Sequence, residues 1–154
     1  MSNLLVSAIN GEWDVVKSLV DVVDDINSVD DEEGRTALMY AVIDEENDAV
    51  KLLLDKGANV NLQDDFGNTA LHFASQNHLL DIARLLLNYK ADANIQDNNG
   101  NTSLSNAVFY SGGRGEMIQL LLEFGGDKYL ENNYGVSPIK LAETFANYDI
   151  SKYF

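Results

Sequence analysis

Acidic residues are the most numerous side chains in this sequence that could do chemistry, and they occur in short runs. The runs are Asp24-Asp25, Asp30-Asp31-Glu32-Glu33 and Asp44-Glu45-Glu46. Paired carboxylates can cleave glycosidic bonds or hold a divalent cation. The calcium-loop pattern fails, because the acid that it needs ahead of Gly67 and Gly100 is replaced by Leu62 and Ile95. We therefore expect solvated turn residues, some contacting a partner, and no metal site.

The two histidines, His72 and His78, are the next candidates, because a histidine can activate a nucleophile. Such catalysis needs a serine or cysteine beside the ring, and the chain has no cysteine. Both histidines are interpreted as structural, with His78 in a turn between helices. We expect no enzymatic activity and no cofactor; a hydrolase that uses the carboxylate runs is the alternative from another class.

The glycine cluster at 111–115, Ser-Gly-Gly-Arg-Gly, could be mistaken for a phosphate-binding loop. It lacks the order of glycines, lysine and hydroxyl residue that cradles phosphates, and no predicted strand precedes it. Two interpretations stay open. The cluster is either a lengthened turn between two helices or a loop that binds a partner through Arg114.

The charge of the chain is strongly negative and unevenly placed. There are 25 acids against 10 lysines and arginines, a formal net charge of −15. Residues 1–50 hold 13 acids and 2 bases, whereas 51–154 hold 12 acids and 8 bases. Such a field repels nucleic acid and anionic membranes and favours a basic protein partner. The alternative is that the acidity only keeps the protein in solution.

The remaining composition is that of an ordinary globular chain. Apolar residues make up 45% of the sequence, which is enough for one domain with a core. No apolar stretch is long enough to span a membrane, and residues 1–10 lack the basic start of a secretory signal. We expect a cytoplasmic protein that is a monomer when free.

Internal repeats determine where these residues lie. Identical residue types recur at a spacing of 33: Gly34, Gly67 and Gly100; Thr36, Thr69 and Thr102; Leu38, Leu71 and Leu104; Ala41, Ala74 and Ala107. A fourth unit follows at 35 residues with Gly135, Ser137, Ile139 and Ala142. Repeats of this length cannot bury their apolar faces alone, so each unit relies on its neighbours.

The helix ends can be read from single residues. Each repeated threonine is expected to start a helix, since its hydroxyl can accept a hydrogen bond from a free N–H of the first turn. Gly57 follows an apolar helical run and is expected in the left-handed conformation that ends a helix. In the first helix pair, Leu4, Leu5, Ala8 and Ile9 are expected to face Val15, Val16 and Leu19.

The repeat resembles the ankyrin family. Residues 64–74 read Asp-Asp-Phe-Gly-Asn-Thr-Ala-Leu-His-Phe-Ala, which is similar to the ankyrin turn followed by Thr-Pro-Leu-His-x-Ala. Proline is kept only at Pro138 and the motif histidine only at His72. The resemblance implies an all-α solenoid of about five helix-turn-helix units in a single domain, 1–154. We expect a cap at 1–30, repeats near 31–63, 64–96 and 97–131, and a C-terminal cap at 132–154.

The resemblance also implies where a partner binds, because ankyrin repeats use their turn tips and the first helix of each unit. The tips carry Glu32, Glu33, Arg35, Asp65, Phe66, Asn68, Asn98, Asn99, Asn101, Asn133 and Tyr134. The ends of the first helices carry Ile43, Asp44, Gln76, Asn77, Phe109 and Tyr110, with Arg114 in the inserted loop. This set is acidic in the early units and rich in amides and aromatic rings in the later ones.

Aromatic residues at these positions suggest contacts that dominate binding. Aromatic side chains give large contact areas and are enriched at binding hot spots. Phe66 and Tyr134 are interpreted as partner contacts. For Phe109 and Tyr110 a second interpretation is kept, in which both rings pack under the inserted loop.

The C-terminal stretch narrows the function further. Residues 132–139 and 146–149 resemble stand-alone bacterial ankyrin proteins, some of which are immunity proteins for secreted toxins. This resemblance implies a non-enzymatic inhibitor whose acidic face binds a basic toxin domain. The alternative within the same class is a scaffold or host-directed adaptor that binds several proteins.

Overall fold

The computed structural model describes residues 2–144 and 149–154, and in this part every regular element is a helix. Their bounds are α1 Asn3–Ile9, α2 Trp13–Leu19, α3 Ala37–Ile43, α4 Asn47–Asp55, α5 Ala70–Gln76, α6 Leu80–Asn88, α7 Ser103–Phe109, α8 Glu116–Glu123, α9 Pro138–Thr144 and the 3₁₀-helix η1 Ser151–Tyr153. The predicted all-α class is confirmed.

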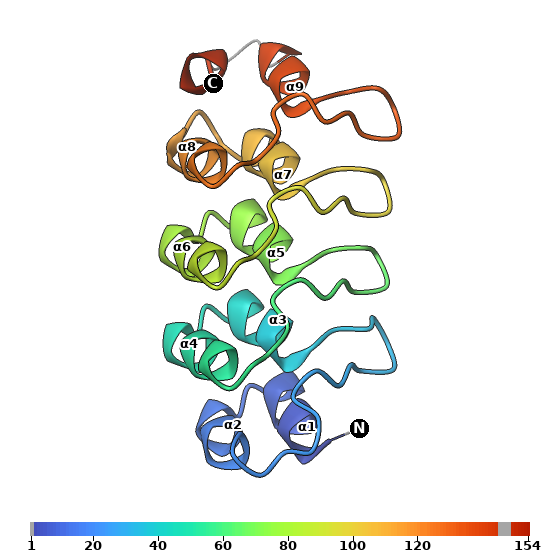
Figure 1. Ribbon diagram of the computed structural model, residues 1–154, viewed down its shortest axis with the longest axis vertical. Helices are drawn as coiled ribbons and strands as arrows, with labels where there is room; N and C mark the ends of the chain where they lie inside the picture. Colours follow the sequence, from blue (N-terminus) through green and yellow to red (C-terminus); the bar gives the residue numbers. More distant parts are fainter. Residues whose placement is uncertain (1, 145–148) are drawn as a thin grey trace.

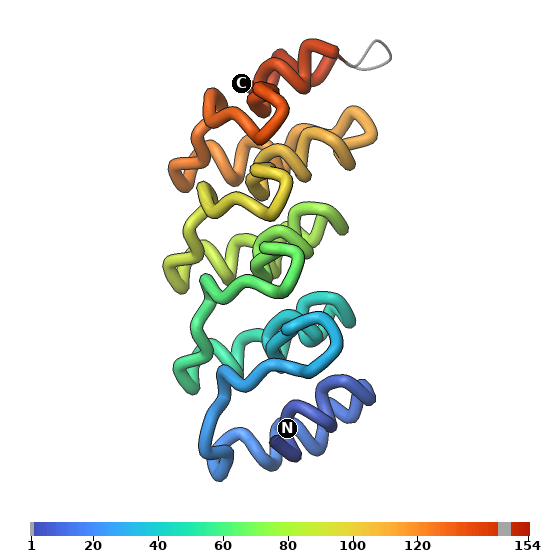
Figure 2. Tube along the Cα trace, turned by 90° about the vertical axis from the view of Figure 1, so that its right-hand side faces the viewer, coloured from blue at the N-terminus to red at the C-terminus, as the bar shows by residue number. Residues whose placement is uncertain are grey.

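The helices form two rows along one long axis (Figure 1). The inner row holds α1, α3, α5, α7 and α9, and the outer row holds α2, α4, α6 and α8. Long loops project beside the inner row, and the two termini lie at opposite ends of the stack (Figure 2). Each of α1, α3, α5 and α7 contacts its outer partner and the next inner helix, and α9 contacts η1. The expected solenoid is therefore confirmed.

The inner helices begin where the repeated threonines predict. Thr36 precedes α3 and its hydroxyl accepts a hydrogen bond from the Met39 N–H at 3.3 Å. Thr102 precedes α7 and accepts from the Ser105 N–H at 3.3 Å. These bonds satisfy first-turn donors that the helix itself leaves without a partner. The predicted helix starts are confirmed.

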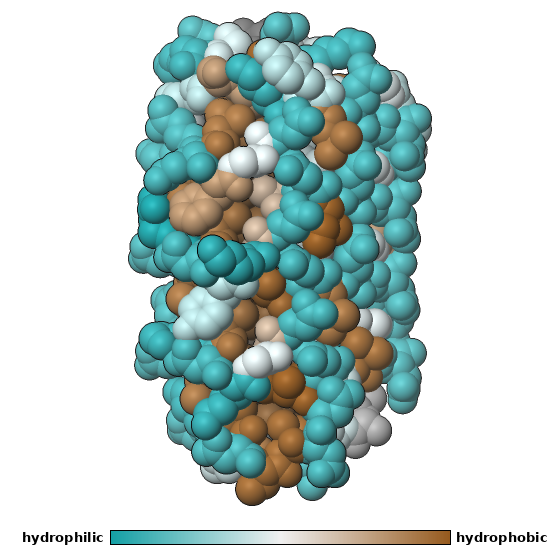
Figure 3. All heavy atoms as spheres, viewed as in Figure 1, coloured by the Kyte–Doolittle hydropathy of each residue, from teal (hydrophilic) through white to brown (hydrophobic). Residues whose placement is uncertain are grey.

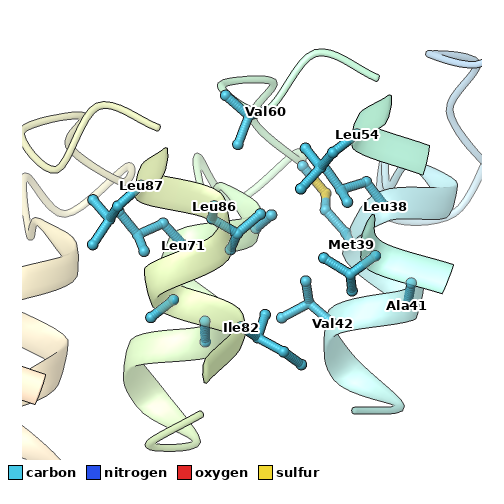
Figure 4. Packing of buried hydrophobic residues seen from close by; sticks show 14 of the residues in the cluster. Leu38, Met39, Ala41, Val42, Leu54, Val60, Leu71, Ile82, Leu86 and Leu87 are labelled. Carbon is cyan, nitrogen blue, oxygen red and sulfur yellow. The ribbon is translucent and has the colours of Figure 1, made fainter. Parts of the chain in front are cut away.

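The core is continuous between units because the apolar residues of one unit pack against those of the next. Figure 4 shows Leu38 and Val42 of α3 on one side and Leu71, Ile82 and Leu86 on the other. All of them are buried. On the face seen in Figure 3, apolar residues run as a band along the stack between polar ones. A stack of this kind is stabilised mainly by the contacts between neighbouring repeats.

The first helix pair agrees with the sequence expectation except at two residues. Leu5 and Val16 are fully buried, whereas Ile9 and Val15 are exposed. The expectation that Ile9 and Val15 belong to the packed faces is wrong, whereas Leu4, Leu5, Ala8 and Val16 are buried as expected. The reason is geometric: a helix of about two turns that packs on one side can bury only one stripe of its surface, and Ile9 ends α1 outside that stripe.

The long loops are each held by one acid or amide side chain at their base. The Asp64 Oδ1 accepts the N–H groups of Phe66 and Asn68 at 3.0 and 2.7 Å, and the Asp97 Oδ1 accepts those of Asn99 and Asn101 at 2.8 and 2.9 Å. Asn132 repeats the arrangement with its single amide oxygen.

Asp30 is the most heavily bonded of these loop residues. Its Oδ1 accepts from the Glu32 and Glu33 N–H groups at 2.8 and 2.7 Å, and its Oδ2 accepts from the Arg35 N–H and the Tyr40 hydroxyl at 2.9 and 3.0 Å. The carboxyl is buried. The expectation that the acid runs are only solvated turn residues is therefore wrong for Asp30, whose carboxylate organises the loop instead.

Asp30→Asn is expected to lower the free energy of unfolding by about 1–2 kcal/mol, because an amide NH₂ would face two donors where the Oδ2 now accepts. Asp97→Asn is the matched control and should cost less than about 0.5 kcal/mol, since among the described residues only its Oδ1 accepts hydrogen bonds and Asn132 does the same with an amide. Urea unfolding followed by circular dichroism measures both. Equal losses in the two variants would contradict this explanation.

Candidate protein-binding surface

Two hollows lie along the side of the stack formed by the inner helices and the long loops. The larger, here called the C-terminal groove, has a volume of about 450 Å³. It is lined by Asn68, Gln76, Asp97, Asn99, Asn101, Ser105, Asn106, Phe109, Tyr110, Asn132, Tyr134, Val136 and Leu141. The N-terminal hollow, about 250 Å³, is lined by Val6, Ile9, Asp30, Glu32 and Tyr40.

The sequence-predicted site residues divide between these hollows and the surface around them. Those in the C-terminal groove are Asn68, Gln76, Asn99, Asn101, Phe109, Tyr110 and Tyr134, while Glu32 lies in the N-terminal hollow. Those that line neither are Glu33, Arg35, Ile43, Asp44, Asp65, Phe66, Asn77, Asn98, Arg114 and Asn133. The structure thus brings the amides and aromatic rings of the later units together.

Sequence reasoning missed the residues in the middle of the inner helices and at the bases of the loops. The missed groove residues are Asp97, Ser105, Asn106, Asn132, Val136 and Leu141. A signal for Asn106 was present, because it shares the 33-residue register of Tyr40 and Phe73. All three are partly exposed on the inner helices, so this register marks a position that faces the binding side.

The aromatic rings of the groove are open to solvent. Tyr134 is 75% exposed, Phe109 58% and Tyr110 45%, and the last two rings meet edge to face with centroids 4.9 Å apart. The inserted loop does not bury them. Instead the Tyr153 ring packs against Gly115 of that loop, and its hydroxyl donates to the Gly113 carbonyl at 3.4 Å. The interpretation that Phe109 and Tyr110 pack under the loop is therefore wrong.

Several predicted contact residues also hold the stack together. Arg35 pairs with Glu33, and its guanidinium lies over the Phe73 ring at 5.1 Å. The Asn98 side-chain amide donates to the Asp65 carbonyl at 2.8 Å, and that of Asn133 to the Asn98 carbonyl at 3.0 Å. These side chains are not freely available to a partner, because binding through them would cost internal hydrogen bonds.

Asp44 and Arg114 have internal partners of the same kind. The Trp13 indole N–H donates to the Asp44 carboxylate at 3.1 Å. The Arg114 Nε donates to the Ser111 carbonyl at 3.0 Å, inside the inserted loop. Both side chains still lie on exposed residues, so they can contact a partner from fixed positions.

The acidic half of the surface is neutralised only in part. Among the described residues, ion pairs in 1–50 reach Asp14, Asp21 and Glu33. Asp30 is held charged: burial raises its pKa, but the N–H groups of Glu33 and Glu32 and the Tyr40 hydroxyl outweigh this and lower the pKa below its usual value. Burial, with the hydrogen bond to Asp30, raises the pKa of Tyr40 to about 12.

His72 links two units from a buried position, in agreement with its structural interpretation. Its Nδ1 accepts the Thr69 N–H at 3.1 Å, and its Nε2 lies 3.2 Å from the Asn101 carbonyl oxygen. The ring is therefore neutral, with its proton on Nε2, and burial lowers its pKa. His78 lies in the turn between α5 and α6 with a positive φ of 59°, as expected, and burial lowers its pKa too.

Acidification is expected to destabilise the fold through His72. Because its folded pKa lies below the unfolded value, stability is complete above about pH 6.5 and falls as the pH drops below it, by at most about 1.4 kcal/mol per pH unit. The test compares His78→Asn, which leaves His72 as the only histidine, with His72→Ser/His78→Asn, where the serine copies Ser105. Urea midpoints at pH 7.5, 6.5 and 5.5 should fall more steeply in the single variant. Equal declines of the urea midpoint in the two variants would contradict the assignment of this pH dependence to His72.

No group of three or more potential metal ligands gathers within the described ranges, 2–144 and 149–154. In the same ranges, none of the helices combines the length and apolarity needed to cross a membrane. The surface features that are present, exposed rings, amides and acids in two hollows, are those with which proteins bind other proteins.

Comparison with known proteins supports the repeat assignment. The family model for ankyrin repeats (3 copies) matches residues 4–97 and, in a second overlapping match, residues 58–133. The two matches together span the stack from α1 to the loop before α9. A comparison with curated proteins finds no match.

Proposed function

The chain belongs to the ankyrin repeat family of protein-protein interaction modules, and we propose that it inhibits a basic protein by covering it with the side that holds both hollows. The partner that we propose is a toxin domain, with this chain as its immunity protein acting as a monomer in the cytoplasm. The observation that carries the proposal is the C-terminal groove, in which three exposed aromatic residues surround amides. Such a surface supplies binding energy without catalytic groups.

The charge distribution supports a basic partner. The exposed acids of residues 1–50 lie at one end of the stack, and the groove lining contains Asp97 but no lysine or arginine. A nuclease toxin carries a basic surface for its nucleic-acid substrate, and an acidic stack can occupy that surface. Complementary charge of this kind raises the association rate and rejects acidic proteins.

A scaffold or adaptor is the second candidate, because the same groove could serve several proteins. The two candidates differ in number of partners and in effect. An immunity protein binds one toxin, encoded beside it, and abolishes its toxicity, whereas an adaptor leaves each partner active. Catalysis through the carboxylate runs is not proposed, since Asp30 is bonded to the loop backbone and Tyr40.

The test of the inhibitor proposal is co-purification with the native host proteins, followed by mass spectrometry and a growth assay. We expect one secreted toxin encoded beside this chain to be recovered, and co-expression of the chain to restore growth. Recovery of several unrelated proteins, with no protection against any of them, would favour the adaptor. Failure to recover a toxin would overturn the inhibitor.

Association with the captured partner is expected to depend on salt. Since the Debye length is about 8 Å at physiological ionic strength, the association rate should fall on the order of tenfold between 50 and 500 mM NaCl. The dissociation rate should change little. Stopped-flow fluorescence measures both rates. An association rate independent of salt would show that the acidity serves solubility alone.

A further inference from the structure

The boundary that follows each of the three units starting near residues 31, 64 and 97 has one pair of polar residues in equivalent positions. The first member follows the turn glycine, at Arg35, Asn68 or Asn101, and the second is the loop-base residue of the next unit, at Asp64, Asp97 or Asn132. We call these the boundary pairs. Because the pairs occupy equivalent positions in successive repeats, the side chains at one boundary show which groups the same position can accommodate at another.

The third boundary pair is hydrogen-bonded within the chain, whereas the first is an ion pair without a hydrogen bond, because the buried Arg35 Nε and Asp64 Oδ2 both lack a hydrogen-bond partner among the described residues. The Arg35 Nε lies 3.8 Å from the Asp64 Oδ2, and the guanidinium covers the Phe73 ring. At the third boundary the Asn132 side-chain amide donates to the Asn101 Oδ1 at 2.8 Å.

The middle boundary pair, Asn68 and Asp97, is open. The Asp97 Oδ1 is used by the loop backbone, but its Oδ2 has no hydrogen bond or ion pair within residues 2–144 and 149–154. The Asn68 side chain likewise makes no bond in that part of the chain. Asn106, which replaces Phe73 in the register, also has a side chain without a bond there. All three residues line the C-terminal groove.

We propose that an arginine side chain of the partner enters the C-terminal groove and pairs with Asp97, as Arg35 does with Asp64. The proposal rests on the proposed function and names the chemistry of the partner at this site. Asn68 is too short to fill the place that Arg35 fills, which leaves a hollow beside an unpaired carboxylate oxygen. Arg35, one repeat earlier in the same chain, is thus an example of the side chain that we propose for this position.

The chemistry of the groove fits a guanidinium better than an ammonium. A guanidinium offers five N–H donors in one plane, and the groove residues Asp97, Asn68 and Asn106 supply the Asp97 Oδ2 and two amide oxygens as acceptors. The exposed rings of Tyr134 and Tyr110 can lie against its planar face, where a cation is attracted. No basic side chain lines the groove to repel it.

The direct test titrates the isotope-labelled protein with a capped Gly-Arg-Gly peptide and follows the side-chain amide signals of Asn68 and Asn106 by NMR. We expect the arginine peptide to cause saturable chemical-shift changes at both side-chain amides. The response should be at least fivefold weaker with a peptide that has lysine in place of arginine. It should be absent with a peptide that has citrulline there, because citrulline lacks the charge. Asp97→Asn should weaken the arginine response at least fivefold, whereas Asp31→Asn at an exposed loop tip should not. Equal responses to the arginine and citrulline peptides, or an equal response of the Asp97→Asn and Asp31→Asn variants to the arginine peptide, would overturn the proposal.

A second test places an arginine of the chain itself in the groove. Asn68→Arg should raise the urea midpoint in the natural background but not with Asp97→Asn, and it should abolish the peptide response. An equal effect in both backgrounds would contradict pairing with Asp97. These experiments need no toxin, so their failure leaves the inhibitor proposal standing, and failure to find a toxin leaves the arginine site standing.

Discussion

Gly67→Ala is expected to lower the free energy of unfolding by about 3 kcal/mol or more, a large share of the total for a domain of this size. Gly67 has φ of +82°, a conformation that costs a residue with a side chain roughly 1–2 kcal/mol. In addition, a methyl group there would lie 2.7 Å from the Asn98 backbone nitrogen and 2.9 Å from the Asp97 carbonyl carbon. That nitrogen donates to the Phe66 carbonyl at 3.0 Å, so the methyl group would push apart the loops of two units.

Gly57→Ala separates the two causes. Gly57 has φ of +88°, but nothing lies within 4 Å of the position of an added methyl group. Lys90, one repeat later, occupies the same place with φ of +69°, so the fold accepts a side chain there. Gly57→Ala should therefore cost only about 1 kcal/mol. Urea unfolding measures both variants, and equal losses would show that loop-to-loop contact at Gly67 adds nothing.

The repeat architecture could be predicted because its determinants are local and periodic. Thr36 and Thr102 accept hydrogen bonds three residues ahead, and Gly57 ends a helix by its own backbone angle. Each effect depends on neighbours in sequence, and each recurs at 33 residues. A pattern that repeats local signals at a fixed spacing indicates both the elements and their stacking.

The burial of single residues could not be predicted in the same way. Asp30 belongs to a run of four acids, and no local signal separates its buried carboxyl from that of its exposed neighbour Asp31. The difference comes from Tyr40 and Arg35, which lie several residues further on and close the loop around it. Similarly, Ile9 is as apolar as Leu5, but Leu5 is fully buried whereas Ile9 is exposed.

The candidate site was predicted in part, for a related reason. The family resemblance points to turn tips and helix ends, and Tyr134 and Phe109 line the groove from those positions. The resemblance does not indicate which loop-tip side chains form ion pairs or hydrogen bonds within the protein. Arg35 and Asn98 turn inward to neighbouring units, whereas the same register leaves Asn68 open. Only side-chain geometry distinguishes a contact surface from a structural bond.

Phe109→Ala and Tyr134→Ala are each expected to weaken binding of the captured partner by about 2 kcal/mol, roughly 30-fold, because each ring loses its contact area in the groove. Stability should change little, since both side chains are more than half exposed in the free protein. Tyr129→Ala is the matched control, because Tyr129 is 66% exposed but does not line the groove.

Isothermal titration calorimetry with the partner measures all three aromatic variants, and Phe66→Ala extends the set to a ring at a loop tip. Phe66 is 54% exposed outside the groove, so its loss reports whether the partner also covers the tips. The groove is the binding site if Phe109→Ala and Tyr134→Ala lose affinity while Tyr129→Ala does not. Losses below about 0.5 kcal/mol at both groove rings would move the site elsewhere on the stack.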